Sequence, residues 1–380
     1  MLESVTDITD TRTVLRSIRA LTASDADLNA RYKRAKNIVR IFRKPAFYEI
    51  TQRCNLRCEG CYYFEDGAVD RGAEEDDLVR WDRFFASEAE RGVSMAYLIG
   101  AEPALEQKRM ELATRYFPYS IVATNGTIRI DRDLPVSIQI SVWGGDNETE
   151  VKLRGAPVFN KAFRNYAGDP RAVIYYTLTP WNLDGVETVV KMSADHGLPI
   201  TFNTYSPTQS FLSKLASGAS NDKDFFRVSS KDDSPRFSAE DLVRTRETVD
   251  HLIETYPDTV IYTHAYNAWV TGMEPIHVID PASGVAHGCG SRVMGQLKYF
   301  GTDLEARDRK CCTQSIDCSE CRLMNGALSS RLQPVAADVA SSDAFRDWLD
   351  MIDMAYKIFV YDPPVNNDPE SASVKTNEFV

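Results

Sequence analysis

The sequence predicts an α/β fold built around a parallel sheet. Between residues 45 and 210, segments rich in Val, Ile, Tyr and Phe alternate with segments of helical periodicity, which is typical of repeated β-α units. The expected strands are 47–51, 94–99, 120–124, 136–142, 172–177 and 200–205. Chemically distinctive residues directly follow several of them, and barrel-type sheets place active sites at the carboxyl ends of strands. We therefore expect one functional site at that edge of the sheet.

The composition indicates a soluble enzyme of the cytoplasm. The chain has 380 residues, a formal net charge of -11 and no apolar run long enough to cross a bilayer. The negative charge argues against nucleic acid as a partner. Eight cysteines without an apolar signal segment favour metal ligation over disulfides.

Three of the cysteines follow the first expected strand in one short loop. Cys54, Cys58 and Cys61 lie in the run Cys-Asn-Leu-Arg-Cys-Glu-Gly-Cys. Three thiolates on a tight loop can hold three irons of a [4Fe-4S] cubane, which normally takes four cysteines, so one iron would stay open. Structural zinc usually takes four ligands in paired short spacings. Zinc and buried structural cysteines remain alternatives to the favoured iron-sulfur site.

The loop and the strand ends after it resemble the radical S-adenosylmethionine (radical SAM) superfamily. Gly100, Ala101, Glu102 and Pro103 resemble the Gly-Gly-Glu-Pro element that binds the amino group of SAM, and Thr124, Asn125 and Ser141 lie at matching strand ends. Arg154 resembles the arginine that pairs with the SAM carboxylate. One departure is Gly60, where many members carry an aromatic residue.

The resemblance implies a partial (β/α)6 TIM-type barrel and a specific chemistry. Cys54, Cys58 and Cys61 would hold a [4Fe-4S] cluster whose open iron binds SAM. An electron from a low-potential donor such as flavodoxin or ferredoxin would then cleave SAM to a 5'-deoxyadenosyl radical, which takes a hydrogen atom from the substrate. The protein supplies geometry and excludes water.

Side-chain alternation along the strands adds candidate residues. Neighbouring side chains point to opposite faces, so Gln139 and Ser141 lie opposite Ile138 and Ile140. The same split predicts a polar lumen lined by Glu49, Gln139, Ser141, Tyr175, Thr177, Asn203 and Tyr205. A closed barrel fills its interior with apolar side chains, so a polar lumen indicates a ligand cavity. We assign Ser141 and Asn203 to the cofactor and the other five to the substrate; the alternative is that they satisfy one another's hydrogen bonds.

A second cysteine group lies between residues 239 and 330. Its members are Cys289, Cys311, Cys312, Cys318 and Cys321, with Cys289 expected to approach across a hairpin from Gly295 to Gly301. The spacing permits a zinc ribbon. Downstream of such a barrel it resembles the twitch or SPASM auxiliary domains, which implies a second [4Fe-4S] cluster held by four of the five cysteines. Either Cys311 or Cys312 would then be spare, as a buried bystander or as a hydrogen-atom donor.

Composition and periodicity divide the chain into six parts. We expect a basic helical segment at 1–44, the core barrel at 45–210, a linker or lid at 211–238, the cysteine-rich hairpin and helix domain at 239–330, a C-terminal helix within 331–365 (near 342–359), and a disordered tail at 366–380. The basic stretch 31–44 either packs under the barrel, which we favour, or lies on an anionic membrane. The acidic cluster 74–77 predicts a helix start. His264, His277 and His287 lack metal-ligand spacing.

The leading hypothesis is a radical SAM oxidoreductase or transferase acting on a small metabolite such as an aminocyclitol, a sugar or a lipid precursor. Its auxiliary cluster would carry an electron to or from the substrate radical and so assist oxidation or bond formation. The alternatives are a maturase of ribosomally made peptides (RiPPs), a redox-neutral epimerase that uses the spare thiol, and a non-catalytic iron-sulfur or zinc protein. The intact cysteine loop and the Gly-Ala-Glu-Pro turn argue against the last of these.

Overall fold

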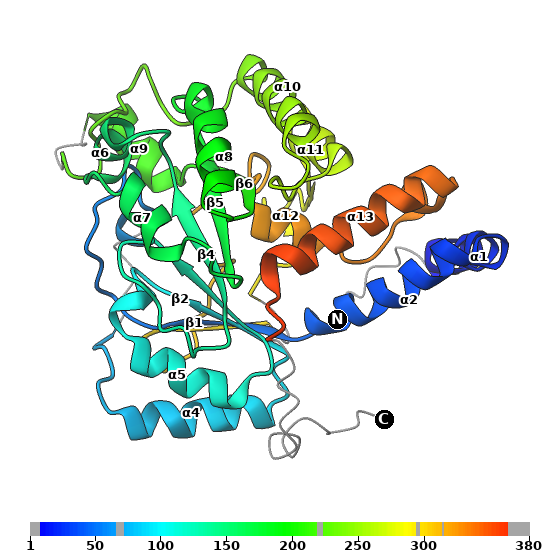
Figure 1. Cartoon of the computed structure of the whole chain (residues 1–380), viewed down its shortest axis with the longest axis horizontal. Helices are drawn as coiled ribbons and strands as arrows, with labels where there is room; N and C mark the ends of the chain where they lie inside the picture. Colours follow the sequence, from blue (N-terminus) through cyan, green and yellow to red (C-terminus); the bar gives the residue numbers. More distant parts are fainter. Residues whose placement is uncertain (1–7, 66–71, 219–222, 294–296, 314, 364–380) are drawn as a thin grey trace.

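A seven-stranded parallel sheet forms the core of the protein (Figure 1). The computed structural model describes residues 8–65, 72–218, 223–293, 297–313 and 315–363. The strands are β1 (Pro45–Glu49), β2 (Met95–Ile99), β3 (Ser120–Thr124), β4 (Ser137–Val142), β5 (Ala172–Leu178), β6 (Ile200–Thr204) and β9 (Lys298–Phe300). Their order is β6-β5-β4-β3-β2-β1-β9, and every neighbouring pair is parallel. The expected α/β fold with a partial barrel is confirmed.

Helices connect the strands and flank the sheet (Figure 1). In the N-terminal half these are α1 (Ile8–Ser24), α2 (Ala26–Ile41), α3 (Tyr62–Glu65), α4 (Leu78–Glu90), η1 (Pro103–Leu105), α5 (Gln107–Tyr116), α6 (Asn147–Arg154), α7 (Phe159–Tyr166), η2 (Leu183–Gly185) and α8 (Val186–Asp195). In the C-terminal half they are α9 (Gln209–Ser217), α10 (Ala239–Thr255), α11 (His264–Val270), α12 (Met324–Ser330), η3 (Ala336–Val339) and α13 (Ser342–Phe359). The expected C-terminal helix is confirmed over 342–359. Helix α9 begins before the expected linker and extends into it.

The outward-facing side chains of the strands make the hydrophobic core. On β4, Ile138, Ile140 and Val142 have no exposed surface, and α7 packs against this strand. Their burial is the main stabilising contribution here, at roughly 1.5–3 kcal/mol for each fully buried side chain. The alternation predicted for β4 therefore fixes which of its faces meets the helices.

The sheet also includes a strand from the C-terminal half of the chain. β9 pairs in parallel with β1, in the register Phe47 with Tyr299, and the chain then turns back so that Arg307 N donates to Tyr299 O. A separate antiparallel pair joins β7 (Val278–Ile279) and β8 (Ala286–His287). Part of the expected hairpin from Gly295 to Gly301 lies outside the described residues. The proposed division into a core and a cysteine-rich domain remains a prediction.

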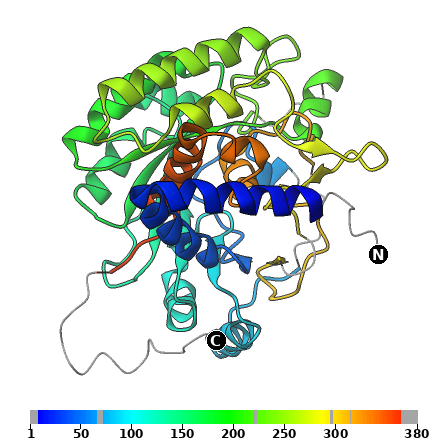
Figure 2. The same cartoon turned by 90° about the vertical axis from the view of Figure 1, so that its right-hand side faces the viewer.

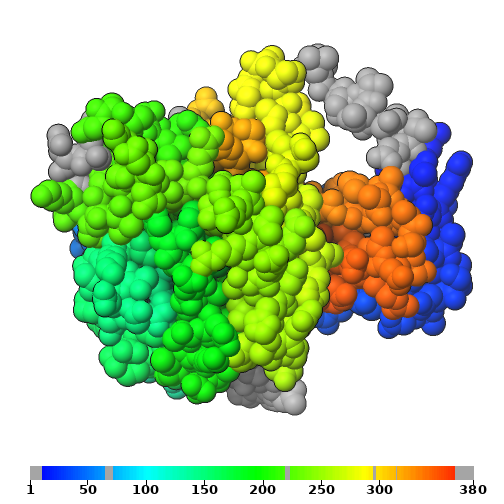
Figure 3. Space-filling view, turned by 90° about the horizontal axis from the view of Figure 1, so that it is seen from above, coloured from blue at the N-terminus to red at the C-terminus, as the bar shows by residue number. Residues whose placement is uncertain are grey.

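The basic segment at the N-terminus packs against the C-terminal helix. Figures 2 and 3 show α1 and α2, in blue, beside α13, in orange-red. Arg31 and Arg34 on α2 form ion pairs with Asp350 and Asp353 on α13. Acidic side chains of α13 thus neutralise part of the positive charge of the basic stretch. Among the described helices, none combines the length and the apolar character needed to span a bilayer.

The acidic cluster after the cysteine loop has two structural uses. Asp77 caps α4, because its side chain accepts a hydrogen bond from Val79 N, so the predicted helix start is confirmed. Glu74 instead points back toward the end of β1. Its contacts belong to the candidate site.

Candidate functional site

The inner face of the sheet keeps accessible surface where the outer face has none. Ala123 on β3 is exposed, and half-buried positions follow at Gln139, Ser141, Tyr175 and Asn203 on the next three strands. Their neighbours along each of these strands are buried. Because β3, β4 and β5 lie inside the sheet, accessible surface on these three strands means that the lumen is not filled there. The polar lumen predicted from alternation is therefore open at these positions.

The first cysteine loop leaves β1 toward this lumen, and its three thiols converge. The charge of Cys58 acts on both Cys54 and Cys61, and that of Cys54 acts on Cys61. Backbone Leu56 N donates to Cys54 Sγ at 3.4 Å. Burial raises the pKa of each thiol, that of Cys61 to about 12. An isolated thiolate is therefore disfavoured, whereas ligation to a cationic iron centre would stabilise it.

Three thiols on one loop are a donor set that a cluster could take. Within the described ranges, no three His, Cys, Asp or Glu side chains are grouped so as to hold one metal ion. A cubane differs from a single ion because each thiolate binds a separate iron at its own corner. Cys54, Cys58 and Cys61 are thus the residues that would hold such a group.

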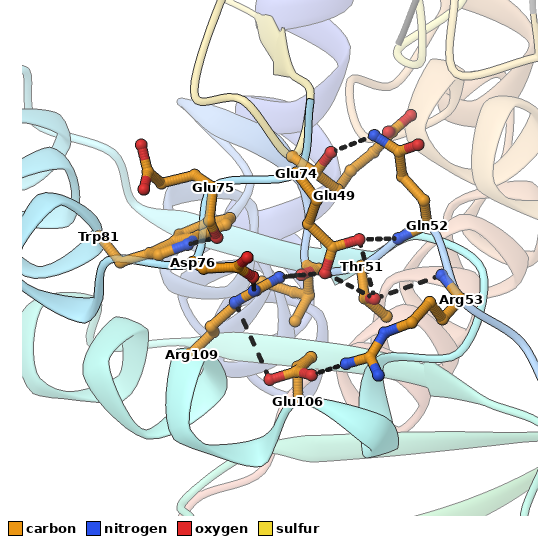
Figure 4. A network of polar contacts seen from close by, with 12 residues as sticks. Glu49, Thr51, Gln52, Arg53, Glu74, Glu75, Asp76, Trp81, Glu106 and Arg109 are labelled. Carbon is orange, nitrogen blue, oxygen red and sulfur yellow. Dashed lines mark hydrogen bonds and ion pairs between the residues drawn. The ribbon is translucent and has the colours of Figure 1, made fainter. Parts of the chain in front are cut away.

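A charged network fixes the junction between β1 and the cysteine loop (Figure 4). Glu74 accepts hydrogen bonds from Thr51 Oγ1 at 2.9 Å, from Gln52 N at 2.9 Å and from Arg109 Nη1 at 2.5 Å. Arg109, buried on α5, also donates to Ile50 O at 2.7 Å. Burial alone would raise the pKa of Glu74, but the bonds from Gln52 and Arg109 lower it below its usual range. The loop therefore starts from a rigid base.

The Gly-Ala-Glu-Pro turn at the end of β2 packs tightly on the neighbouring strand. A Cβ on Gly100 would lie 2.6 Å from Thr51 O, and its φ is +130°, so only glycine fits there. Ala101 N donates to Thr51 O, and Glu102 accepts from Thr124 Oγ1 at 2.6 Å and Asn125 N at 2.7 Å. Glu102 is 1% exposed, so its carboxylate ties the ends of β2 and β3 together. Pro103 begins η1 directly behind it.

The end of β3 touches the cysteine loop directly. Asn125 Nδ2 donates to Asn55 Oδ1 at 2.8 Å and lies 3.9 Å from Cys54 Sγ. Asn55 in turn donates to Thr127 Oγ1 at 2.8 Å. These amides hold Cys54 in place and provide a polar contact to its sulfur.

Arg154 lies beside Cys58 and is matched by a buried carboxylate. Its Nη1 is 3.1 Å from Glu150 Oε2, and the two side chains are 1% and 0% exposed. Arg154 also donates to Ser141 O and Asn125 O, while its Nε has no partner. Glu150 Oε1 accepts from Trp143 N and Gly144 N at the end of β4. The guanidinium thus has one donor left for a ligand.

A segment of the expected lid is fastened to the cysteine loop. The Glu59 carboxylate, between the second and third cysteines, accepts hydrogen bonds from Arg227 N at 2.6 Å, Val228 N at 3.2 Å and Ser229 N at 3.1 Å. Further along, Arg236 pairs with Glu320, between Cys318 and Cys321. Residues 227–236, which we call the strap, therefore contact both cysteine loops.

In the second cysteine group, the thiols lie close together, and one of them also reaches the lumen. The charges of Cys289, Cys311 and Cys318 all act on Cys321, whose pKa burial raises to about 12. A hydrogen bond with Cys311 and burial raise the pKa of Cys312 well above its usual value, and the charge of Cys289 adds to this effect. The Cys312 thiol also acts on Tyr62, Tyr97 and Tyr175. Tyr97 and Tyr175 belong to β2 and β5, and Tyr175 is half-buried on the open face. Cys312 therefore lies between the other cysteines and the lumen.

The remaining residues predicted for cofactor or substrate have varied positions. Gln139 and Tyr175 are half-buried on the open face, and Gln139 Nε2 has no partner. Glu49 and Thr177 are buried; Glu49 accepts from Tyr299 Oη at 2.5 Å. Asn203 Oδ1 accepts from Met324 N at the start of α12 at 3.0 Å. Tyr205 donates to Gly60 O at 2.7 Å.

Several residues of the site were not predicted from sequence. They are Glu59, Tyr62, Glu74, Arg109, Glu150 and Arg309. Glu59 and Tyr62 lie next to cysteines of the motif in the sequence, and this position could have identified them as candidates. The other four carry no local signal, since their partners are assembled by the fold.

The chain matches no family model and no curated protein. Among solved structures it is similar to SuiB of Streptococcus suis bound to S-adenosylmethionine, with a TM-score of 0.48 and 13% identity over 69% of this chain and 59% of SuiB. The structure of SuiB bound to its precursor peptide SuiA has a TM-score of 0.48 and 13% identity, over 93% of this chain and 72% of SuiB. Native anSMEcpe with bound AdoMet and Kp18Cys peptide has a TM-score of 0.46 and 13% identity, over 83% of this chain and 96% of anSMEcpe. These likenesses are distant.

The parallel partial barrel, with a three-cysteine loop after its first strand, agrees with the fold that the sequence resemblance implied.

Proposed function

We propose that this protein is a radical SAM enzyme that reductively cleaves SAM and abstracts a hydrogen atom from a substrate held in the lumen. The observation that carries the proposal is the convergence of three thiols beside an unfilled polar lumen. When bound, the [4Fe-4S] cluster supplies the electron that cleaves SAM to the 5'-deoxyadenosyl radical. The chain's own residues hold the cysteine loop rigid, provide polar strand ends for SAM and shield the reaction from water.

We further propose that Cys289, Cys311, Cys318 and Cys321 hold an auxiliary [4Fe-4S] cluster. The charges of Cys289, Cys311 and Cys318 on Cys321 support this. Cys312, which is hydrogen-bonded to Cys311 and also reaches Tyr97 and Tyr175, would be the spare thiol. A fully ligated cluster next to the lumen is suited to exchange an electron with a substrate radical, which favours oxidation or bond formation. Cys312 beside Tyr97 and Tyr175 supports redox-neutral epimerisation as the second candidate.

Anaerobic reconstitution followed by iron counting and a 5'-deoxyadenosine assay tests these proposals. The wild-type protein should hold about eight irons, and both C54S and C311S should hold about four. C312S should keep about eight and still cleave SAM. Iron-loaded protein that leaves SAM intact under a strong reductant would refute the enzyme assignment, and full iron loading of C311S would refute the ligand set.

The substrate class is proposed as a small metabolite, with a peptide as the alternative. Product analysis separates the electron-transfer and epimerisation candidates. An epimerase in deuterated water should incorporate one solvent deuterium at the inverted carbon, and C312S should lose that incorporation while still forming 5'-deoxyadenosine. An oxidised or cross-linked product would favour the auxiliary-cluster mechanism.

A further inference from the structure

Arg309 lies at the lumen with a guanidinium that the fold does not fully satisfy. Its side chain is 9% exposed and stacks over the Tyr299 ring, with 4.4 Å between the guanidinium carbon and the ring centroid. Its Nε is buried and has no hydrogen-bond partner among the residues that the structure describes. Its ion pair with Glu49 has an Nη1–Oε1 distance of 3.8 Å, which is too long for a hydrogen bond.

Glu49 does not depend on Arg309 for its own hydrogen bonds. Its carboxylate accepts from Tyr299 Oη at 2.5 Å and from Tyr63 Oη at 3.3 Å. A buried guanidinium with open donors costs free energy, because water has been removed from them without replacement. Such a cost is typical of a side chain kept to bind a ligand.

The surroundings of Arg309 place it close to the first cysteine loop. Tyr62, directly after Cys61, lies within electrostatic reach of Cys61, Cys312, Glu49 and Arg309. Tyr62 is 39% exposed, so part of its side chain is free to contact a ligand. A ligand held by Arg309 would extend past Tyr62 toward Cys61.

We propose that Arg309 binds the carboxylate of the substrate and so orients the rest of that molecule toward the cysteine loop. The assignment of the ligand as substrate rests on the function proposed above. The guanidinium edge presents parallel N–H donors that match the two oxygens of a carboxylate. A phosphate dianion fits less well because Glu49 lies beside the site and repels a second negative charge.

Two matched probes, phenylacetate and phenylacetamide, can test this proposal on anaerobically reconstituted protein. They differ in charge and share an aromatic ring, which a tyrosine-lined lumen accepts. Calorimetry should show phenylacetate binding at least tenfold more tightly than phenylacetamide or inorganic phosphate. R309M should abolish that preference. The surface variant R115M, which removes an exposed arginine paired with Glu111, should keep it.

Thermal unfolding separates ligand binding from a purely structural role. R309M leaves the buried Glu49 carboxylate without its cation and should lower the midpoint, whereas R309M/E49Q removes both charges and should recover most of it. A wild-type preference for phenylacetate in R309M/E49Q, absence of phenylacetate binding to the wild type, or tighter binding of phosphate would each overturn the proposal. SAM cleavage without substrate should be unchanged in the surface variant R115M. Loss of cleavage in the wild type would instead refute the proposed function.

Discussion

The Tyr205 hydroxyl donates a 2.7 Å hydrogen bond to the carbonyl of Gly60, inside the first cysteine loop. Tyr205 directly follows the edge strand β6, whereas the loop follows β1, so this bond links two strands that are far apart in the strand order. A Cβ on Gly60 would lie 2.5 Å from Tyr205 Oη and 3.0 Å from Phe211. Aromatic side chains from elsewhere in the chain thus fill the space beside this position, which explains the absence of an aromatic residue at 60.

Replacing Gly60 by Ala should destabilise the loop through two causes. Its φ of +55° disfavours any side chain, at a cost of about 1 kcal/mol, and the new methyl group meets the tyrosine hydroxyl. Y205F removes the hydroxyl, so the double variant G60A/Y205F should lose less stability than the sum of the single variants. Urea unfolding and iron content should both show this. If the two losses of stability simply add, the Tyr205 side chain moves away from the new methyl group without a cost in free energy.

The strap should depend on the charge of Glu59. E59Q keeps the size of the side chain but weakens the bonds from Arg227 N, Val228 N and Ser229 N, because a carboxylate accepts more strongly than an amide. We expect a loss of about 1–3 kcal/mol and faster proteolysis within 223–236. The control is E148Q, which changes an exposed glutamate paired with Lys152. If E59Q and E148Q are cleaved at the same rate, Glu59 does not hold the strap.

Glu74 should make stability depend on pH. Its folded-state pKa lies below the ordinary value of 4.5, since hydrogen bonds from Gln52 and Arg109 outweigh the effect of burial. The ionised carboxylate therefore stabilises the fold at neutral pH, and this contribution disappears as the pH falls through the lowered pKa. E74Q should be about 1–3 kcal/mol less stable at pH 7, and the difference should shrink below pH 4.5.

Urea unfolding of the wild type and E74Q from neutral pH to about pH 3 checks this. E111Q, at an exposed glutamate paired with Arg115, should unfold like the wild type at every pH. A difference for E74Q that grows toward acid would contradict a lowered pKa.

Local patterns accounted for most of the fold. The six strands of the main sheet before residue 210 and helix α13 were predicted with ends within two residues, because alternation and amphipathic periodicity are properties of neighbouring residues. β9 was not predicted as a member of this sheet. It has three residues and pairs with β1 roughly 250 positions away, and parallel pairing across such a distance leaves no local signal.

The site residues show the same division between local and distant contacts. Cys54, Cys58, Cys61 and the Gly100–Pro103 turn were visible as motifs, because ligands on one loop must be close in sequence. Arg309 and Glu74 were not visible, because their surroundings are assembled from distant parts of the sequence. Tyr299 contacts Glu49 across 250 positions, and Arg109 contacts Glu74 across 35. The contacts that support the motif are therefore tertiary, although the motif itself is local.

Arg154 provides a test of whether its buried charge serves the fold alone or also the cofactor. R154M leaves Glu150 as an unpaired buried carboxylate, which should cost about 3–5 kcal/mol in urea unfolding. E150Q in the same chain removes that charge and keeps Oε1 as the acceptor for Trp143 N and Gly144 N, so R154M/E150Q should recover most of the stability. If Arg154 also binds the SAM carboxylate, the double variant should still bind SAM about ten- to a hundredfold more weakly, as expected for a lost charge-assisted bond of about 1.5–3 kcal/mol. Anaerobic equilibrium dialysis with SAM measures this, and wild-type affinity in the stable double variant would limit Arg154 to a structural role.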